Sequence, residues 1–218
     1  MEQIKNIDKI IHLLKQEVKA FENPVVSKIG EIQKDPFKVL ISCILSLRTQ
    51  DRTTGPIALK LFEAADTPKK LAKMPLGKIQ KIIRPVNYYI TKSIRIKQIA
   101  KDIIEKYDGK VPDKFEELMK LKGVGKKTAA ITMVYGHNKP DYIPVDVHVF
   151  QISNRLGWVK TKNAEDIESE IVSIKNTARD HKKKKQPLLI KIKKDKNLFA
   201  VLHFFEQLTY GRDLRKKN

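Results

Sequence analysis

The sequence predicts an all-α protein. Apolar residues recur at intervals of three and four along most of its 218 residues, which is the spacing of amphipathic helices. Asp-Pro, Thr-Pro and Asp-Gly pairs between these segments are typical of helix starts and ends. No extended alternation of polar and apolar residues indicates a sheet. One short strand is predicted within the basic loop that begins at residues 181–185.

The first half of the chain predicts a buried central helix. Residues 2–20 form an amphipathic helix, and a second helix opens at Asp35-Pro36, with aspartate as its N-cap. Residues 39–45 are apolar nearly all round, so we expect this second helix to lie in the core. It ends in a polar elbow over residues 46–51.

Four more helices follow before residue 110. One runs from about Arg52 to Ala64, two short ones begin at Thr67-Pro68 and Pro75, and a long one follows a turn at residues 87–89 and ends at Asp108-Gly109. The stripe expected to face the core on the long helix comprises Ile90, Ile94, Ile99, Ile103, Ile104 and Tyr107.

A glycine hairpin between two helices is the centre of the sequence. Asp113 and Glu116 form a capping box for the first helix, and Gly123 and Gly125 end it before a second helix runs towards residues 133–134. Glycines let a backbone approach a phosphate closely, and the N-terminus of a helix favours an anion. Lysines in that first turn oppose the helix dipole unless an anion lies there. The alternative is an ordinary turn with solvated lysines.

The rest of the chain is predicted as a connector and three helices. The connector spans residues 138–144, and the helices lie near 145–156, 167–174 and 198–208.

Composition favours a polyanionic partner. Lys and Arg total 45 against 25 Asp and Glu, a formal net charge of +20, which favours nucleic acid before an anionic membrane surface. A highly charged surface without a specific partner is the alternative. The single cysteine, Cys43, excludes a disulfide framework and is predicted to be buried. We find no signal-peptide core or membrane-spanning run, so an intracellular, soluble protein is expected.

These motifs together resemble one family. The hairpin Leu121–Ala130, followed by Pro144-Val145-Asp146-Val147-His148-Val149, is similar to helix-hairpin-helix DNA glycosylases of the endonuclease III branch. The segments 44–51 and 152–157 look like the same family, and the resemblance covers roughly residues 30–175. It implies a two-lobed all-α fold with a DNA cleft between lobes. Residues 34–139 would form a six-helix barrel lobe, and residues 1–33 with 140–218 the second lobe.

The resemblance also implies a chemistry. Lys127 occupies the family's nucleophilic lysine position and Asp146 its catalytic aspartate, which implies a bifunctional glycosylase and apurinic/apyrimidinic lyase acting through a Schiff base. Monofunctional relatives carry another residue at the lysine position. Lys127 as a further phosphate contact and Asp146 as a helix N-cap are the structural alternatives, and the N-cap is compatible with catalysis.

Further DNA contacts are implied at the hairpin and in two loops. Arg48 stands where the branch often has a glutamine that fills the gap left by a flipped base, and either that role or a phosphate contact is open. Tyr88 lies in a loop that resembles a second intercalating loop, with a half-buried core tyrosine as the alternative. Asn87 replaces a common glycine there and tolerates left-handed backbone. The other residues assigned to DNA binding are Gly123, Val124, Gly125, Lys126, Thr128 and His148, the last mainly as a hydrogen-bonded support.

The chain departs from the family's pattern at its C-terminal region. Most members carry four cysteines there for a [4Fe–4S] cluster, whereas residues 198–218 have none, so no cluster is expected. A monovalent cation at the hairpin carbonyls is the only cofactor that the resemblance implies. The expected substrate is duplex DNA with an oxidised pyrimidine or an abasic site, bound by a monomer in the cytoplasm, nucleoid or nucleus. A preference for oxidised guanine or for uracil or thymine mismatches, and a non-catalytic DNA-binding protein, are the alternatives.

Overall fold

The computed structural model describes residues 35–139 and, beyond them, Tyr142, Pro144, Val145, Phe150, Gln151, Asn154, Thr161 and Lys162. The chain divides into two compact units, and residues 35–139 belong to the unit Val25–Pro144. The predicted lobe boundaries stay a prediction. The described part of the chain is helical and contains no strand, which confirms the predicted all-α class. The predicted helix at 2–20, the basic loop and the helices beyond residue 162 lie outside the described residues.

The central helix is α3 (Pro36–Ser46), as the sequence predicts. Asp35 caps it by accepting hydrogen bonds from the Phe37 and Lys38 backbone N–H groups at 2.9 and 3.3 Å. Every residue from Val39 to Leu45 is buried. Because α3 packs against α4, α7 and α9, a helix that is apolar on all sides is the one that can occupy this position.

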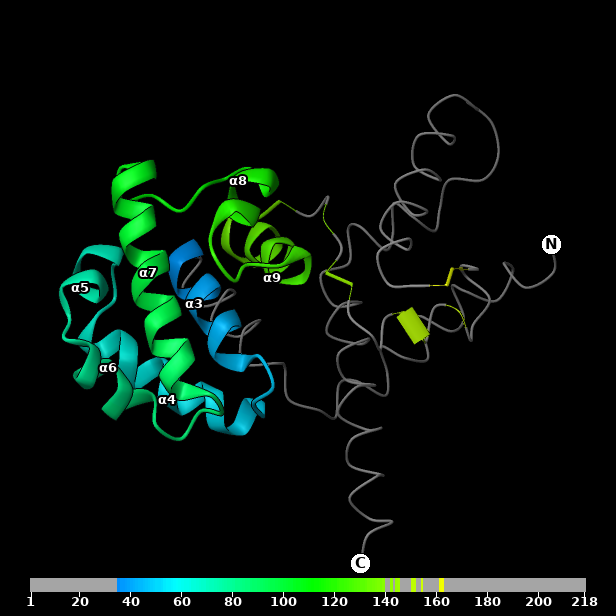
Figure 1. The fold of residues 1–218 in the computed structure, drawn as a ribbon. Coiled ribbons are helices and arrows are strands. Elements are labelled where there is room, and N and C mark those ends of the chain that lie inside the picture. The colour runs from blue at the N-terminus through cyan, green and yellow to red at the C-terminus, as the bar shows by residue number, and fades with distance from the viewer. Residues whose placement is uncertain are drawn as a thin grey trace, which may run out of the picture. The chain divides into compact units, whose positions relative to one another are not determined.

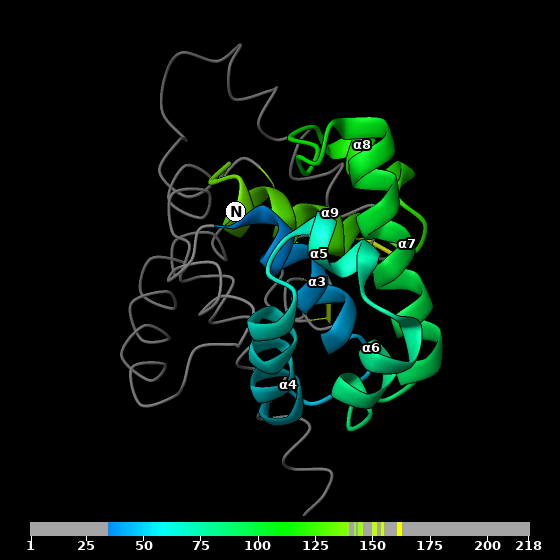
Figure 2. The ribbon, with the colours of Figure 1, turned by 90° about the vertical axis from the view of Figure 1, so that its left-hand side faces the viewer.

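Four helices follow α3 before residue 110, in the order that the sequence predicts (Figure 1). Next come α4 (Asp51–Ala64), α5 (Pro68–Lys73) with Thr67 as its cap, and α6 (Leu76–Ile83). The long helix α7 (Tyr89–Tyr107) then packs along α5 and α6, and Figure 2 shows it from the side. The left-handed Asp108 and Gly109 end it where the Asp-Gly pair predicts.

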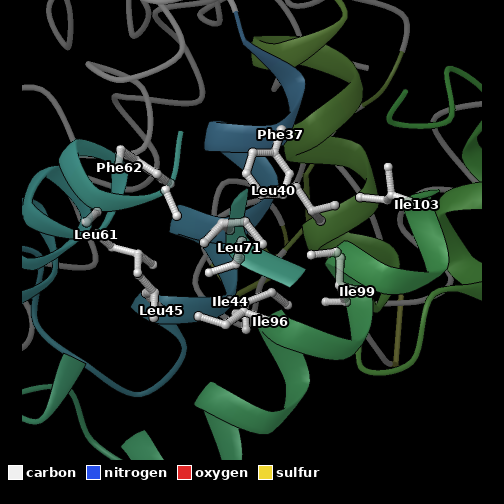
Figure 3. Close-up of a cluster of buried hydrophobic side chains, with 14 of the residues drawn as sticks. Phe37, Leu40, Ile44, Leu45, Leu61, Phe62, Leu71, Ile96, Ile99 and Ile103 are labelled. Atoms are coloured by element: carbon white, nitrogen blue, oxygen red, sulfur yellow. The ribbon is translucent and has the colours of Figure 1, made fainter. Parts of the chain in front are cut away.

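The core forms where α3, α4, α5 and α7 meet. Figure 3 shows side chains from these four helices packed together. Burying a large aliphatic side chain contributes roughly 1.5–3 kcal/mol, so this contact layer fixes the relative positions of the helices. The labelled residues of the layer are Phe37, Leu40, Ile44, Leu45, Leu61, Phe62, Leu71, Ile96, Ile99 and Ile103.

The predicted core face of α7 is partly wrong. Ile90 and Ile94 are 54% and 53% exposed, and Ile104 is 37% exposed. The buried face is offset from the predicted stripe, because the partners of α7 contact a different side of the helix. Its buried residues are Lys92, Ser93, Ile96, Ile99, Ala100, Asp102 and Ile103.

The predicted capping box is also wrong. The helix α8 (Phe115–Lys120) has Lys114 at its N-cap and no side-chain cap. Asp113 instead forms an ion pair with Lys139, with 2.9 Å between Oδ2 and Nζ, and Lys139 also donates to the Asp113 carbonyl. The hydrogen bond from Lys139 lowers the pKa of Asp113 below its usual value. This contact attaches the connector to the start of the hairpin unit.

Candidate active site

The glycine hairpin joins α8 to α9 (Lys126–Ile131), and α9 continues as the π-helical turn η2 (Thr132–Gly136). The Val124 N–H donates to the Leu121 carbonyl at 3.0 Å, which closes a four-residue turn. Gly123 is its third residue and has φ +89°, a position that strongly favours glycine. The predicted helix, hairpin and helix are confirmed.

The two hairpin glycines differ in what they do. At Gly123, a Cβ would lie 2.4 Å from Cδ and Nε of Arg95, a flexible side chain that would have to move, and the left-handed backbone is what makes the turn favour glycine. Gly125 is the N-cap of α9 and has an extended backbone, with φ −97° and ψ 175°. A Cβ there would meet nothing within 4 Å. Gly125 therefore leaves an open approach to the start of α9.

Two lysines open α9. Lys126 is exposed, and Lys127 is half-buried. The backbone hydrogen bond from the Ala129 N–H to the Gly125 carbonyl, at 2.9 Å, is the first of this helix, so the N–H groups of residues 126–128 precede the helical ladder. Thr128 and Val124 are each 5% exposed. Because these two side chains are buried, the DNA contacts predicted for Val124 and Thr128 would have to be made by their backbone groups.

Lys127 lies close enough to the central helix for its charge to act there. Burial raises the pKa of the Cys43 thiol to about 12, an effect that the positive charge of Lys127 opposes and the negative charge of Asp51 reinforces. Cys43 is 2% exposed, as predicted, and its thiol stays protonated at neutral pH. The hairpin lysine is thus an electrostatic neighbour of α3.

The elbow between α3 and α4 comprises residues 47–50 and presents Arg48. This side chain is exposed, and its backbone is left-handed, with φ 53°. Tyr88, in the turn before α7, is 62% exposed and has φ 59°. The exposure excludes the alternative of a core tyrosine. The left-handed residue of that turn is Tyr88, and Asn87, which would also tolerate this conformation, does not adopt it.

Sequence reasoning missed Lys92, which is 4% exposed in α7. Its Nζ donates to the carbonyls of Leu45 and Leu47 at 2.7 and 2.6 Å and to Thr49 Oγ1 at 3.1 Å. Burial, with a smaller contribution from the charge of Arg95, lowers the pKa of Lys92 to about 8. All three ammonium protons are used, and the amine is enclosed, so Lys92 is a structural lysine and not a nucleophile. The sequence gives no sign that Lys92 is buried, because the apolar pattern of a helix identifies only its apolar buried residues.

Two predicted site residues, Asp146 and His148, lie outside the described residues. Nearby, Phe150, Gln151 and Asn154 are helical, and the Asn154 Nδ2 donates to the Phe150 carbonyl at 3.0 Å. Within residues 35–139 and the few described positions beyond, no group of three or more His, Cys, Asp or Glu side chains is arranged to hold a metal ion. No helix of the described part is long and apolar enough to cross a membrane.

An all-α unit with a glycine hairpin leading into a lysine-bearing helix defines the helix-hairpin-helix class. The family model described as HhH-GPD superfamily base excision DNA repair protein matches residues 41–189, and the chain belongs to this superfamily. Its relatives include endonuclease III proteins. That of Thermotoga maritima is 48% identical over 139 residues, which cover 64% of this chain and 65% of the relative, just under two thirds. That of Buchnera aphidicola is 38% identical, with 67% and 70% covered.

Solved structures agree with this assignment. A non-covalent complex of endonuclease III with DNA is similar at a TM-score of 0.64 and 31% identity, covering 77% of each chain. A thermostable thymine-DNA glycosylase is similar at 0.54 and 25% identity, covering 60% of this chain and 64% of that one. A Helicobacter pylori 3-methyladenine DNA glycosylase, 18% identical with a TM-score of 0.66 over 92% and 97% of the chains, shares the fold.

Proposed function

We propose that this protein is a base-excision repair DNA glycosylase with apurinic/apyrimidinic lyase activity. The observation that carries the proposal is the position of Lys127, in the first turn of the helix that follows the glycine hairpin, in a chain of the HhH-GPD superfamily. Its partner is duplex DNA with a damaged base or an abasic site, bound by a monomer. The formal net charge of +20 suits that polyanion.

The hairpin would grip a phosphate beside the damaged nucleotide. Gly125 supports this role, because its lack of a side chain leaves the N–H groups at the start of α9 open to a close approach. Lys126 adds an exposed positive charge at the same place. A phosphate there also removes the conflict between these lysines and the helix dipole.

The chemistry would follow from Lys127 and Asp146. The damaged nucleotide leaves the base stack, because its glycosidic bond is unreachable inside the duplex. Asp146 stabilises the positive character that develops on the sugar as the base departs. The neutral amine of Lys127 attacks C1′, and a Schiff base forms as the C1′–O4′ bond of the sugar ring opens and O4′ takes up the proton that the amine loses. Loss of the C2′ proton then expels the 3′ phosphate by β-elimination, since the iminium accepts the electron pair.

An iron–sulfur cluster does not fit this sequence. A [4Fe–4S] cluster needs four thiolates, and Cys43 is the single cysteine, buried in α3 with its pKa raised to about 12. A monovalent cation at the hairpin carbonyls remains part of the proposal. The Leu118 and Leu121 carbonyls each accept one backbone hydrogen bond in the turn and keep a second lone pair. No step of the proposed reaction passes through either group.

The proposed substrate is an oxidised pyrimidine such as thymine glycol. The names of the two relatives described above support this choice, since both are endonuclease III proteins. A glycosylase for a mismatched thymine is the second candidate, favoured by the likeness to the thymine-DNA glycosylase structure. Lys127 favours the first, because monofunctional relatives carry another residue at that position.

Product analysis on four duplexes tests the proposal. The first duplex carries a thymine glycol, the second an 8-oxoguanine opposite cytosine and the third a uracil opposite guanine. The fourth carries no lesion. We expect the wild type to cleave the thymine-glycol strand without alkali, and Lys127→Gln to lose this cleavage. Lys126→Gln is the matched control and should weaken binding only. Base release that needs alkali for strand cleavage in the wild type would contradict the lyase assignment.

A further inference from the structure

Two exposed loop residues share a costly backbone conformation. Arg48 in the elbow and Tyr88 in the turn before α7 both have left-handed φ values, 53° and 59°. Such a conformation is unfavourable for every residue other than glycine, because the Cβ approaches the following carbonyl oxygen. It persists only where the surroundings determine it, so the contacts around these two residues identify what holds them in place.

The first such contact joins the two loops directly. The Asn87 side chain donates from Nδ2 to the Arg48 carbonyl at 2.6 Å, across 39 residues of sequence. Asn87 precedes Tyr88, so this one bond connects the backbone of one left-handed residue to the neighbour of the other. A glycine at position 87 could not make this bond.

The second contact passes through Lys92. Its backbone N–H donates to the Tyr88 carbonyl at 3.0 Å, in the first turn of α7. Its ammonium group binds the carbonyls of Leu45 and Leu47 and the Thr49 hydroxyl, on both sides of Arg48. Through the neighbouring Leu47 and Thr49, these contacts connect Arg48, Asn87, Tyr88 and Lys92 into a closed ring of covalent and hydrogen bonds. We name these four residues the loop brace.

We propose that the loop brace makes Arg48 and Tyr88 a single DNA-distorting element, with Asn87 and Lys92 as its positioning residues. This inference rests on the proposed function. Insertion of side chains into the duplex requires unstacking, and a support that is already ordered avoids losing conformational freedom during that step. Because the two loops are bonded to each other, movement of one changes the position of the other. The two side chains should therefore contribute cooperatively.

A double-mutant cycle tests the coupling. Arg48→Ala, Tyr88→Ala and the double variant are compared for affinity to a duplex with one stable abasic analogue, with 2-aminopurine opposite it to report unstacking. We expect the double variant to lose at least about five-fold less affinity than the product of the single losses. When the same cycle is measured in an Asn87→Ala background, the affinity loss of the double variant should approach the product of the two single losses. A cycle in the Gln98→Ala background is the control, since Gln98 makes a comparable amide bond, to Asp102, on the same helix.

Two results would overturn the inference alone. One is multiplicative losses in the wild-type background, and the other is unchanged coupling with Asn87→Ala. If the wild type does not distinguish the abasic duplex from an undamaged one, the proposed function fails as well.

Lys92 gives a second readout with its own control. Lys92→Met should reduce the 2-aminopurine response several-fold while affinity for undamaged DNA changes little. Lys97→Met, which removes a lysine that donates to the Met74 carbonyl from the same helix, should leave both unchanged. Equal losses on damaged and undamaged DNA with Lys92→Met would show general structural damage and contradict its positioning role. If that variant does not fold, the Asn87→Ala cycle decides alone.

Discussion

The Arg95 side chain crosses the hairpin at Gly123 so closely that a Cβ on this glycine would lie 2.4 Å from both Cδ and Nε of the arginine. Arg95 belongs to α7, so the glycine turn and the long helix support each other. Gly125, two residues later, has no such neighbour. One glycine therefore maintains the hairpin, and the other keeps its surface open.

This difference predicts that alanine at position 123 affects stability, whereas alanine at position 125 affects DNA binding. Gly123→Ala should lower the free energy of unfolding by about 1–3 kcal/mol, because it strains a left-handed backbone and displaces Arg95. Gly125→Ala should change it by less than about 0.5 kcal/mol but weaken DNA binding at least several-fold. Urea denaturation and a binding titration measure both. Unimpaired DNA binding by Gly125→Ala would contradict the role of this glycine in phosphate contact.

The buried Lys92 predicts an unusual pH dependence of stability. Its pKa falls from 10.5 in the unfolded chain to about 8 in the folded one, mainly through burial. Between these pH values the unfolded state binds more protons than the folded state. The contribution of Lys92 to the free energy of unfolding therefore increases as the pH rises, and it is lost as the pH falls through about 8. The neutral amine still donates to two carbonyls and accepts from the Thr49 hydroxyl.

Comparison of the wild type with Lys92→Met measures this effect. The destabilisation caused by the substitution should be greater at pH 9.5 than at pH 7, by about 1–2 kcal/mol. Urea denaturation at the two pH values gives the difference, and Gln98→Ala, which removes no titratable group, is the control. A destabilisation that stays constant or shrinks at high pH would contradict a buried, protonated lysine at neutral pH.

The junction of η2 with α3 gives a prediction about packing alone. A Cβ on Gly136 would lie 2.7 Å from the Cα of Pro36, and backbone cannot move aside as a flexible side chain can. Gly136→Ala should therefore destabilise the protein by about 1–3 kcal/mol. Gly77→Ala, in the first turn of α6 with nothing within 4 Å, should stabilise it by about 0.4–1 kcal/mol. Thermal unfolding of both variants measures these effects. A Gly136→Ala variant that melts at the temperature of the wild type would contradict the close packing of Gly136 against Pro36.

Local signals explain what could be predicted of the fold. Asp35-Pro36, Thr67-Pro68 and Asp108-Gly109 mark helix ends within a few residues of chain, and the structure has helix ends at all three. The glycine hairpin is equally local. These signals depend on backbone geometry and capping, which neighbouring residues determine.

Contacts between distant residues explain what could not be predicted. Isoleucines lie around much of α7, so only its partners decide that Ile94 is exposed and Ile96 buried. The bond from Asn87 to Arg48 spans 39 residues, and the ion pair that takes Asp113 from its predicted cap spans 26. A buried lysine contradicts the usual hydropathy pattern, and its acceptors come from a helix end more than 40 residues away.

The most direct test of the proposed chemistry is borohydride trapping on a duplex with one abasic site. The wild type should form a covalent adduct, because borohydride reduces the Schiff base between Lys127 and C1′. Lys127→Ala should abolish the adduct, Lys126→Ala should keep it, and Asp146→Asn should reduce it. An adduct that survives Lys127→Ala, or a wild type that binds the duplex tightly without forming one, would contradict Lys127 as the nucleophile.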